Sequence, residues 1–399
     1  MQFRLASARY LLAALALTVM LAGCAGVSAP APQGEPPISP ATHVSGLMDL
    51  ANPNALSLAQ ITEGFREYLN SGSGPVGPRL TALFAHWNLR PVPNSTLVLD
   101  ADLDGDGTAE TVAVYRDTKS ATGAMGSLFV ISGKAGQYTV DRSAEEVLMP
   151  ALYTVADLNQ DGRPEIVWST TSIGANTTTS QIYLSAWSPG SLQTQRGEVT
   201  MTNVTNIAAR EQELVLTGGT KGGFGAGAAQ RSQVARYTWA GGALKLSDKQ
   251  FAASEYSYHK LQDGLVAEEL GKRKEAGAAY AAATEPNRQV LPPGDAVPDE
   301  WREKLADAVR TFSQLRIALL QIDSQTPAEF VHKVLGGSWG RYEGLTKSAL
   351  AAKDRQGVCS AAVKWAEANP EFIQALNSPR GYANPQWKPA DLCGPMPAF

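Results

Sequence analysis

One stretch decides the fold of this chain: Leu97-Val98-Leu99-Asp100-Ala101-Asp102-Leu103-Asp104-Gly105-Asp106-Gly107-Thr108-Ala109-Glu110-Thr111-Val112-Ala113-Val114-Tyr115. It places an acidic loop between two runs rich in β-branched residues, the composition typical of β-strands. A related stretch runs from Leu152 to Trp168, and its Asp157 stands 55 residues after Asp102. The repetition predicts a repeated β module with one acidic loop in each copy.

Both loops place oxygen-bearing side chains at positions 1, 3, 5 and 9 and a glycine at position 6. In the two loops these residues are, in order, Asp102, Asp104, Asp106 and Glu110 with Gly107, and Asp157, Asn159, Asp161 and Glu165 with Gly162. Calcium accepts six to eight oxygen ligands in a flexible shell. The carbonyl groups at position 7, from Thr108 and Arg163, would complete each shell. We therefore expect two calcium-binding loops.

Two other interpretations of the loops were weighed. An EF-hand needs a bidentate glutamate at position 12, but that position holds Ala113 in the first loop and Trp168 in the second. A solvated Asp/Gly hairpin without metal is the remaining alternative. It leaves unexplained why four carboxylates stand within nine residues of the first loop, since such carboxylates repel one another without a cation.

The motifs Asp102-x-Asp104-x-Asp106-Gly107-x-x-Glu110 and Asp157-x-Asn159-x-Asp161-Gly162-x-Pro164-Glu165 resemble the FG-GAP (VCBS, integrin-α-like) family. The resemblance implies β-propeller blades that bind calcium. A third unit is expected from about Asn203, because the sequence Glu213 to Leu216 is similar to Glu165 to Trp168. The loop of this unit, at residues 208–212, lacks the aspartates, so no metal is expected there. Since closed propellers have four to eight blades, about three units predict a partial propeller, with closure through a dimer left open.

The N-terminus has the form of a secretion signal. Arg4 and Arg9 precede an apolar run that is too short to span a membrane, and Leu21-Ala22-Gly23-Cys24 resembles a bacterial lipobox. That resemblance implies a signal peptide at residues 1–23 and a lipid anchor on Cys24, hence a membrane-bound extracytoplasmic protein of the bacterial cell envelope. A plain secretory signal with an incidental cysteine is the alternative. The Pro/Ala-rich residues 24–54 predict a disordered tether.

Helical patterns flank the β-repeat domain, which is assigned to residues 93–252. Residues 55–92 predict a helical hairpin that caps it, with Leu58, Ile61, Phe65 and Leu69 at helical spacing. Residues 253–399 predict an α-helical domain. Its Gly264, Gly271, Ala276, Tyr280 and Ala283 resemble one tetratricopeptide repeat. Such helices either bind peptides on a concave surface or only cover the β domain. The predicted class is thus α+β multidomain.

Cys359 and Cys393 remain as an even pair once Cys24 carries lipid. In an oxidising compartment the simplest interpretation is a disulfide, with two separate buried thiols as the alternative. The net charge of −4 and the pI of about 5.7 argue against a nucleic-acid partner.

Known catalytic signatures are missing from the sequence. The four histidines, His43, His86, His259 and His332, lack metal-site spacing, and the glycine-rich residues 218–227 lack the ending of a P-loop. We therefore expect no enzyme. The expectation is a lipid-anchored binding or scaffold protein with structural calcium and a protein or glycan partner. An envelope hydrolase that uses an acid pair, such as Glu145-Glu146 or Glu268-Glu269, is the alternative.

Overall fold

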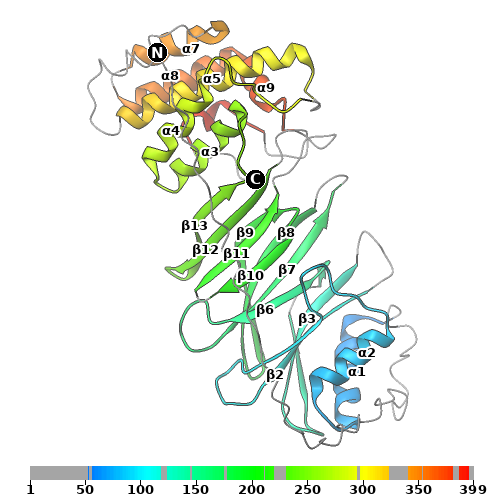
Figure 1. The fold of residues 1–399 in the computed structure, drawn as a ribbon. Coiled ribbons are helices and arrows are strands. Elements are labelled where there is room, and N and C mark those ends of the chain that lie inside the picture. The colour runs from blue at the N-terminus through cyan, green and yellow to red at the C-terminus, as the bar shows by residue number, and fades with distance from the viewer. Residues whose placement is uncertain are drawn as a thin grey trace, which may run out of the picture. The chain divides into compact units, whose positions relative to one another are not determined.

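The structure is a computed structural model, and it describes residues 53, 56–117, 124–143, 146–174, 178–210, 212–219, 231–293, 297–322, 340–352, 354–380 and 386–394. The chain divides into a unit of residues 1–40 and a unit of residues 41–399, and all described residues belong to the second. The predicted signal peptide, Cys24 and all of the tether except Pro53 lie outside the described residues. The predicted mixture of helices and strands is confirmed (Figure 1).

Three antiparallel sheets follow one another along the chain, and in each the main strands pair in sequence order. The first sheet contains β1 (Val98–Ala101), β2 (Glu110–Arg116), β3 (Met125–Ser132) and β4 (Thr139–Arg142), with β5 (Val147–Leu148) paired to β3. The second contains β6 (Ala151–Ala156), β7 (Glu165–Ile173), β8 (Thr178–Ser188) and β9 (Ser191–Thr202). The third contains β10 (Asn206–Arg210), β11 (Glu213–Gly219), β12 (Ser232–Ala240) and β13 (Ala243–Phe251). Each sheet is therefore a simple meander.

The third hairpin differs from the sequence-based expectation. Residues 208–212 were predicted as a loop, but β10 continues to Arg210 and pairs it with Glu213 of β11. A tight turn thus takes the place that the acidic loops hold in the other two sheets. The described residues contain no closed ring of sheets.

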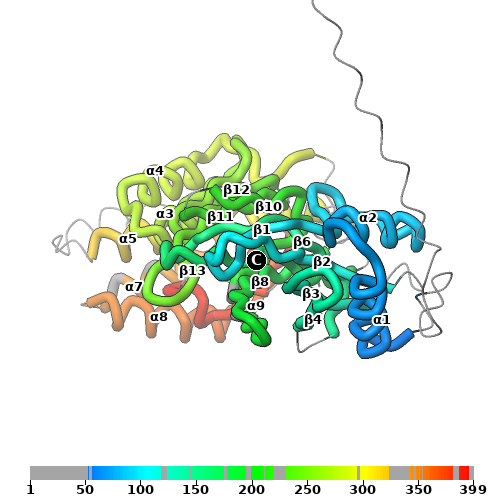
Figure 2. The backbone as a smooth tube through the Cα atoms, turned by 90° about the horizontal axis from the view of Figure 1, so that it is seen from below, coloured from blue at the N-terminus to red at the C-terminus, as the bar shows by residue number. Residues whose placement is uncertain are grey.

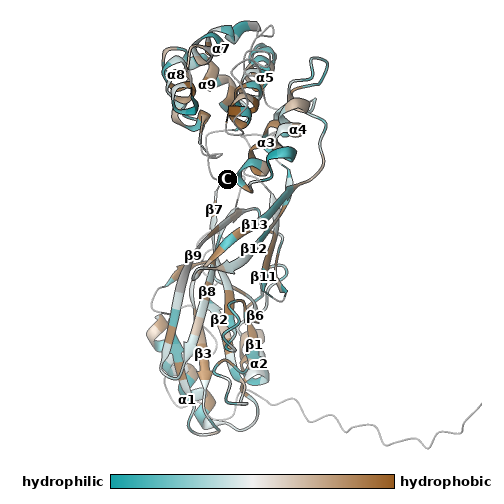
Figure 3. Cartoon of the chain, turned by 90° about the vertical axis from the view of Figure 1, so that its left-hand side faces the viewer, coloured by the Kyte–Doolittle hydropathy of each residue, from teal (hydrophilic) through white to brown (hydrophobic). Residues whose placement is uncertain are grey.

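The sheets bury one another face to face. Side chains alternate between the two faces of a strand, and Figure 3 shows hydrophobic residues interspersed with polar ones along the strands. Val112 and Val114 of β2 pack with Ile166 and Trp168 of β7 in one cluster, which joins the first sheet to the second. Val167, on the other face of β7, belongs to a cluster with strands of the third sheet. The second sheet is therefore buried on both faces.

Two helices cover the remaining face of the first sheet. They are α1 (Leu58–Ser71), which begins with a Ser57/Gln60 capping box, and α2 (Val76–His86). Phe65 of α1 lies 5.2 Å, between ring centroids, from Phe129 of β3, and Asn70 exchanges two hydrogen bonds with the backbone of Tyr138 beside β4 (Figure 2). The predicted helical hairpin thus packs on a sheet face and not only at an edge.

The outer face of the third sheet is polar. Leu214 and Leu216 of β11 point into the cluster shared with the second sheet. On the opposite face of β11, Glu213 forms an ion pair with Arg236 on β12, with 3.4 Å between Oε2 and Nη1. Arg236 in turn stands opposite Asp248 of β13. Covering this face with a further sheet would bury charges at a high energetic cost, so the stack ends here.

Arg231 ties the third sheet to the helices that follow. It precedes β12, and its guanidinium lies 2.8 Å from Asp263 Oδ1 on α3 (Ser257–Glu269). It also donates to the carbonyl oxygen of His259 at 3.1 Å and lies 4.3 Å from the ring centroid of Phe251. This buried arginine was not singled out from the sequence, because its partners come from separate elements.

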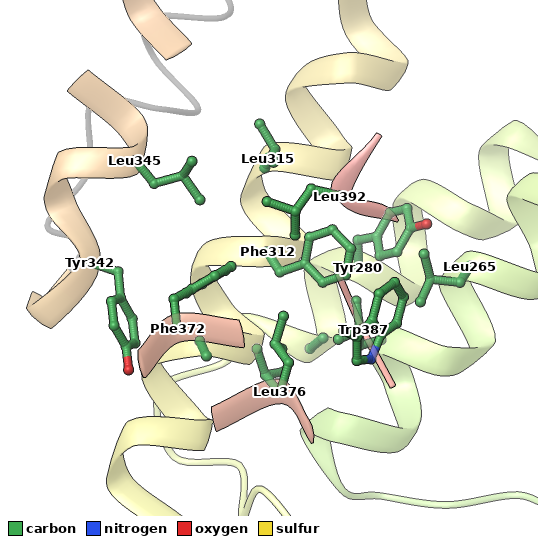
Figure 4. Close-up of a cluster of buried hydrophobic side chains, with 14 of the residues drawn as sticks. Leu265, Tyr280, Phe312, Leu315, Tyr342, Leu345, Phe372, Leu376, Trp387 and Leu392 are labelled. Atoms are coloured by element: carbon green, nitrogen blue, oxygen red, sulfur yellow. The ribbon is translucent and has the colours of Figure 1, made fainter. Parts of the chain in front are cut away.

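The helical region has a single hydrophobic core. It contains α3, α4 (Arg273–Ala283), α5 (Asp299–Ile322), η2 (Gly340–Tyr342), α7 (Glu343–Leu350), α8 (Arg355–Ala368), α9 (Pro370–Asn377) and η3 (Pro389–Leu392). Tyr280, Phe312, Trp387 and Leu392 meet in this core (Figure 4). The stretch Thr326-Pro327-Ala328-Glu329, whose pattern predicts a capping box, lies outside the described residues. Pro370 starts α9, since proline suits the first helical turn.

Cys359 on α8 and Cys393 after η3 form a disulfide with a Cα–Cα distance of 5.7 Å. Arg316 of α5 donates to the carbonyl oxygens of Leu392 and Gly394, at 3.1 and 2.8 Å. The C-terminal segment is therefore held by a covalent bond on one side and by a buried guanidinium on the other.

Gly264 and Gly277 offer a matched test of helix packing. A Cβ on Gly264 of α3 would lie 2.4 Å from Cε1 of Tyr280, whereas a Cβ on Gly277 of α4 would meet nothing within 4 Å. We expect Gly264→Ala to lower the free energy of unfolding by about 1–3 kcal/mol through overpacking. Gly277→Ala should raise it by about 1 kcal/mol through helix propensity. Urea unfolding followed by circular dichroism measures both; equal effects would contradict the observed packing.

Candidate metal centre

The two acidic loops occupy the same place in consecutive sheets: the first joins β1 to β2 and the second joins β6 to β7. In each loop two residues have positive φ angles. They are Gly105 (79°) and Gly107 (84°) in the first loop, and Gln160 (61°) and Gly162 (85°) in the second. Glycine adopts this region without steric cost. The non-glycine residue Gln160 shows that the second loop keeps the same path even where the sequence differs.

The first loop gathers three carboxylates. One oxygen each from Asp102, Asp104 and Asp106 lies within 4.8 Å of the others. Backbone N–H groups hold these side chains: Gly105 and Gly107 donate to Asp102 at 2.8 and 2.9 Å. Asp106 N–H donates to Asp104, and Thr108 N–H donates to Asp106. The donor set is made of hard oxygens only, which is the set that calcium prefers, so the residues present fit this cation.

Glu110 lies beneath the loop and is not part of this carboxylate group. It is only 4% exposed, and its Oε2 accepts the Leu103 N–H at 2.9 Å. Burial raises the pKa of Glu110, and the charges of Asp104, Asp106 and Asp102 raise it further, while the Leu103 hydrogen bond lowers it. Glu110 is therefore not among the three carboxylates that the structure gathers, and its role as a fourth ligand stays a prediction.

The second loop repeats the frame with a different interior. Gly162 N–H donates to Asp157 at 3.0 Å, and Leu158 N–H donates to Oε2 of Glu165 at 2.9 Å. The side-chain amide of Asn159 donates to Oδ2 of Asp161 at 3.1 Å and also to Glu165. Here an amide bridges the carboxylates, and a rotation that exchanges its nitrogen and oxygen would present an acceptor instead. The sequence predicted two loops of the same kind, but their side chains therefore interact differently.

The remaining predicted ligands are the position 7 residues. Thr108 and Arg163 use their N–H groups to hold Asp106 Oδ1 and Asp161 Oδ1, at 2.6 and 2.8 Å. The ligand role of their carbonyl groups stays a prediction.

Of the acids in the two pairs considered for a hydrolase, the described residues Glu146 and Glu269 are exposed, and Glu268 is held by neighbouring side chains. Glu268 lies 2.8 Å from Arg316 NH2 and accepts the Tyr280 hydroxyl at 2.8 Å, so it is a structural bridge in the helical core. Glu145 lies outside the described residues. A shallow depression of about 710 Å³ contains Glu255 and Glu285, and the hydrogen bond from Arg288 lowers the pKa of Glu255, the opposite of what a general acid requires.

The two described histidines, His86 and His259, lie on different helices and have different surroundings. His259 is buried, with Nδ1 2.6 Å from the Ser254 hydroxyl oxygen, and His86 is exposed near the end of α2. His43 and His332 lie outside the described residues.

Two residues that sequence reasoning missed are Leu103 and Leu158, each the second residue of its acidic loop. Their exposed fractions are 0% and 1%. The signal was available, because an apolar residue stands at the same position between two metal-type side chains in both loops.

Within the described part of the chain, every helix is too short or too polar to cross a membrane.

The chain matches no family model, no curated protein and no solved structure.

The buried glutamates generate a pH prediction. Since the folded-state pKa values of Glu110 and Glu165 are raised, metal-free protein should lose stability as pH rises through them. Glutamine still accepts the leucine N–H but carries no charge. In chelator, the melting temperature of the double variant Glu110→Gln/Glu165→Gln should therefore rise relative to that of wild type as the pH increases from about 5 to about 8. Glu303→Gln, on the exposed side of α5, is the control; a pH-independent difference would contradict the burial argument.

Proposed function

We propose that this protein is a lipid-anchored, extracytoplasmic binding or scaffold protein whose β domain is a partial FG-GAP-like propeller stiffened by calcium. The observation that carries the proposal is that two loops 55 residues apart repeat a hydrogen-bond frame as well as a sequence. In both, the position 6 glycine donates to the position 1 aspartate, and the position 2 leucine donates to the position 9 glutamate. A chance Asp/Gly turn would not keep this frame twice.

The arrangement of the sheets supports the blade interpretation. Each meander packs its face on the next, as successive blades do. The first strands of the sheets also approach one another: Thr96 N–H donates to the Leu152 carbonyl at 2.8 Å, and the Asn94 side chain donates to the Thr205 carbonyl. These residues stand at or near the starts of β1, β6 and β10, the strands that would surround the axis of a propeller.

Calcium would be held by Asp102, Asp104 and Asp106 in the first loop, with the Thr108 carbonyl and Glu110 as further ligands. In the second loop Asp157, Asn159, Asp161, Arg163 through its carbonyl, and Glu165 would hold it. The bound cation neutralises the loop carboxylates. The chain's own contribution is to preshape these side chains by backbone N–H groups, so that little ordering is needed on binding.

The helical region and the polar surfaces would bind the protein or glycan partner. A hydrolase has less support, because Glu268 and Glu255 are both engaged by arginines. A nucleic-acid partner is not proposed, given the acidic balance of the chain.

Calcium should stabilise the chain from Ala25 onward. With a dissociation constant of about 10⁻⁴–10⁻³ M, about 10 mM calcium should raise the melting temperature by roughly 3–10 °C relative to chelator. Asp104→Ala should lose much of this rise and change the midpoint in chelator little. Asp299→Asn, at the exposed start of α5, should keep it. Wild type that melts identically in both buffers would refute the calcium proposal.

The lipid anchor is tested by cell fractionation. In a bacterial host the wild-type chain should sediment with membranes and incorporate labelled fatty acid, because more than one acyl chain gives stable anchoring. Cys24→Ser should abolish the label and release the protein. A matched Cys359→Ser variant should remain labelled. Labelling that survives loss of Cys24 would refute the anchor.

A further inference from the structure

The second residue of each acidic loop lies at the interface between two sheets. Leu103 belongs to the cluster that joins the first sheet to the second, together with Val112, Leu128 and Trp168. Leu158 belongs to the cluster that joins the second sheet to the third. The two loops therefore reach two different interfaces, and each reaches the one between its own sheet and the next.

Each leucine is fixed on both sides by the metal-type side chains. Leu103 stands between Asp102 and Asp104 in the chain, so its backbone position follows the loop's winding. Its N–H is held by Glu110, the first residue of β2. Leu158 is held in the same way by Glu165, the first residue of β7. A glutamate has a second oxygen, which would contact the proposed cation while Oε2 holds the leucine N–H. In the second loop, binding would require this oxygen of Glu165 to exchange the Asn159 amide for the cation.

The distribution of loops follows the distribution of interfaces. The three sheets form two interfaces, and acidic loops occur in the first and second sheets only. The third sheet ends the stack with a charged face, and its β10–β11 turn has no aspartate ladder. A loop is thus present wherever a following sheet must be held.

We propose that calcium bound in each acidic loop stabilises one inter-sheet interface, through Leu103 in the first loop and Leu158 in the second. We call this arrangement a latch. This rests on the proposed calcium binding. The first loop then controls the packing of the first sheet on the second, and the second loop controls the packing of the second sheet on the third. A leucine that only filled space in the core would not make interface stability depend on its own loop's metal.

Hydrogen exchange followed by mass spectrometry tests the latch on the mature chain carrying Cys24→Ser. Calcium should slow exchange by about tenfold or more in strands of all three sheets. Asp104→Asn should lose this protection in β2 and β3 but keep it in β11 and β12. Asp161→Asn should show the reverse. A uniform response of all sheets to either variant, or protection confined to the two loops, would overturn the latch.

A leucine pair provides the matched control. Leu103→Ala should still bind calcium in the first loop but lose its calcium-dependent protection of β2 and β3. Leu128→Ala removes a side chain from the same cluster without touching the loop, and should lower stability in both buffers while keeping the calcium response. The reverse pattern would overturn the role of Leu103.

Calcium titration calorimetry on the same proteins separates the two proposals. Wild type should bind two ions, and each aspartate variant should bind one. Absence of binding to wild type would overturn the proposed function together with the latch. Binding of two ions without interface protection would overturn the latch alone.

Discussion

The need to cover every apolar sheet face is the constraint on which the rest of the structure depends. A four-stranded sheet with apolar residues on both faces needs a cover on each side. The second sheet is covered by its two neighbours, through Trp168 on one face and Val167 on the other. The first sheet has a neighbour on one side only, and α1 and α2 supply the other cover. The third needs one cover, because Glu213 and Arg236 make its outer face polar.

The loops add an electrostatic condition to this packing. Three aspartates near one another are offset in part by backbone N–H groups of Gly105, Gly107 and Thr108, so the loop keeps its shape through its own peptide. Glu110 and Glu165 lower the stability of the metal-free fold when they are charged, since burial raises the pKa of both. A carboxylate held out of water without a positive partner favours protonation or cation binding. The same residues that carry the calcium proposal therefore carry a stability cost in its absence.

The sequence predicted the strands and loops well, because alternation and Asp/Gly spacing are local signals. It also placed α1 from the helical spacing of its apolar residues Leu58, Ile61, Phe65 and Leu69. The packing of α1 and α2 on a sheet face was not predicted, although the unbroken apolar run Val112 to Tyr115 already indicated burial of β2 on both sides. The inequality of the two loops depends on which way the Asn159 amide points, and that is set by neighbours in space.

The charged outer face of the third sheet has a consequence for how copies of the protein meet. A stack that adds sheets face to face could in principle continue from one molecule into the next, and such head-to-tail contacts grow into fibres when they do not close. Helices occupy one end of this stack and ion-paired charges occupy the other. Neither end offers an apolar face to a second copy. These charges thereby disfavour polymerisation through the same kind of interface that holds the sheets together.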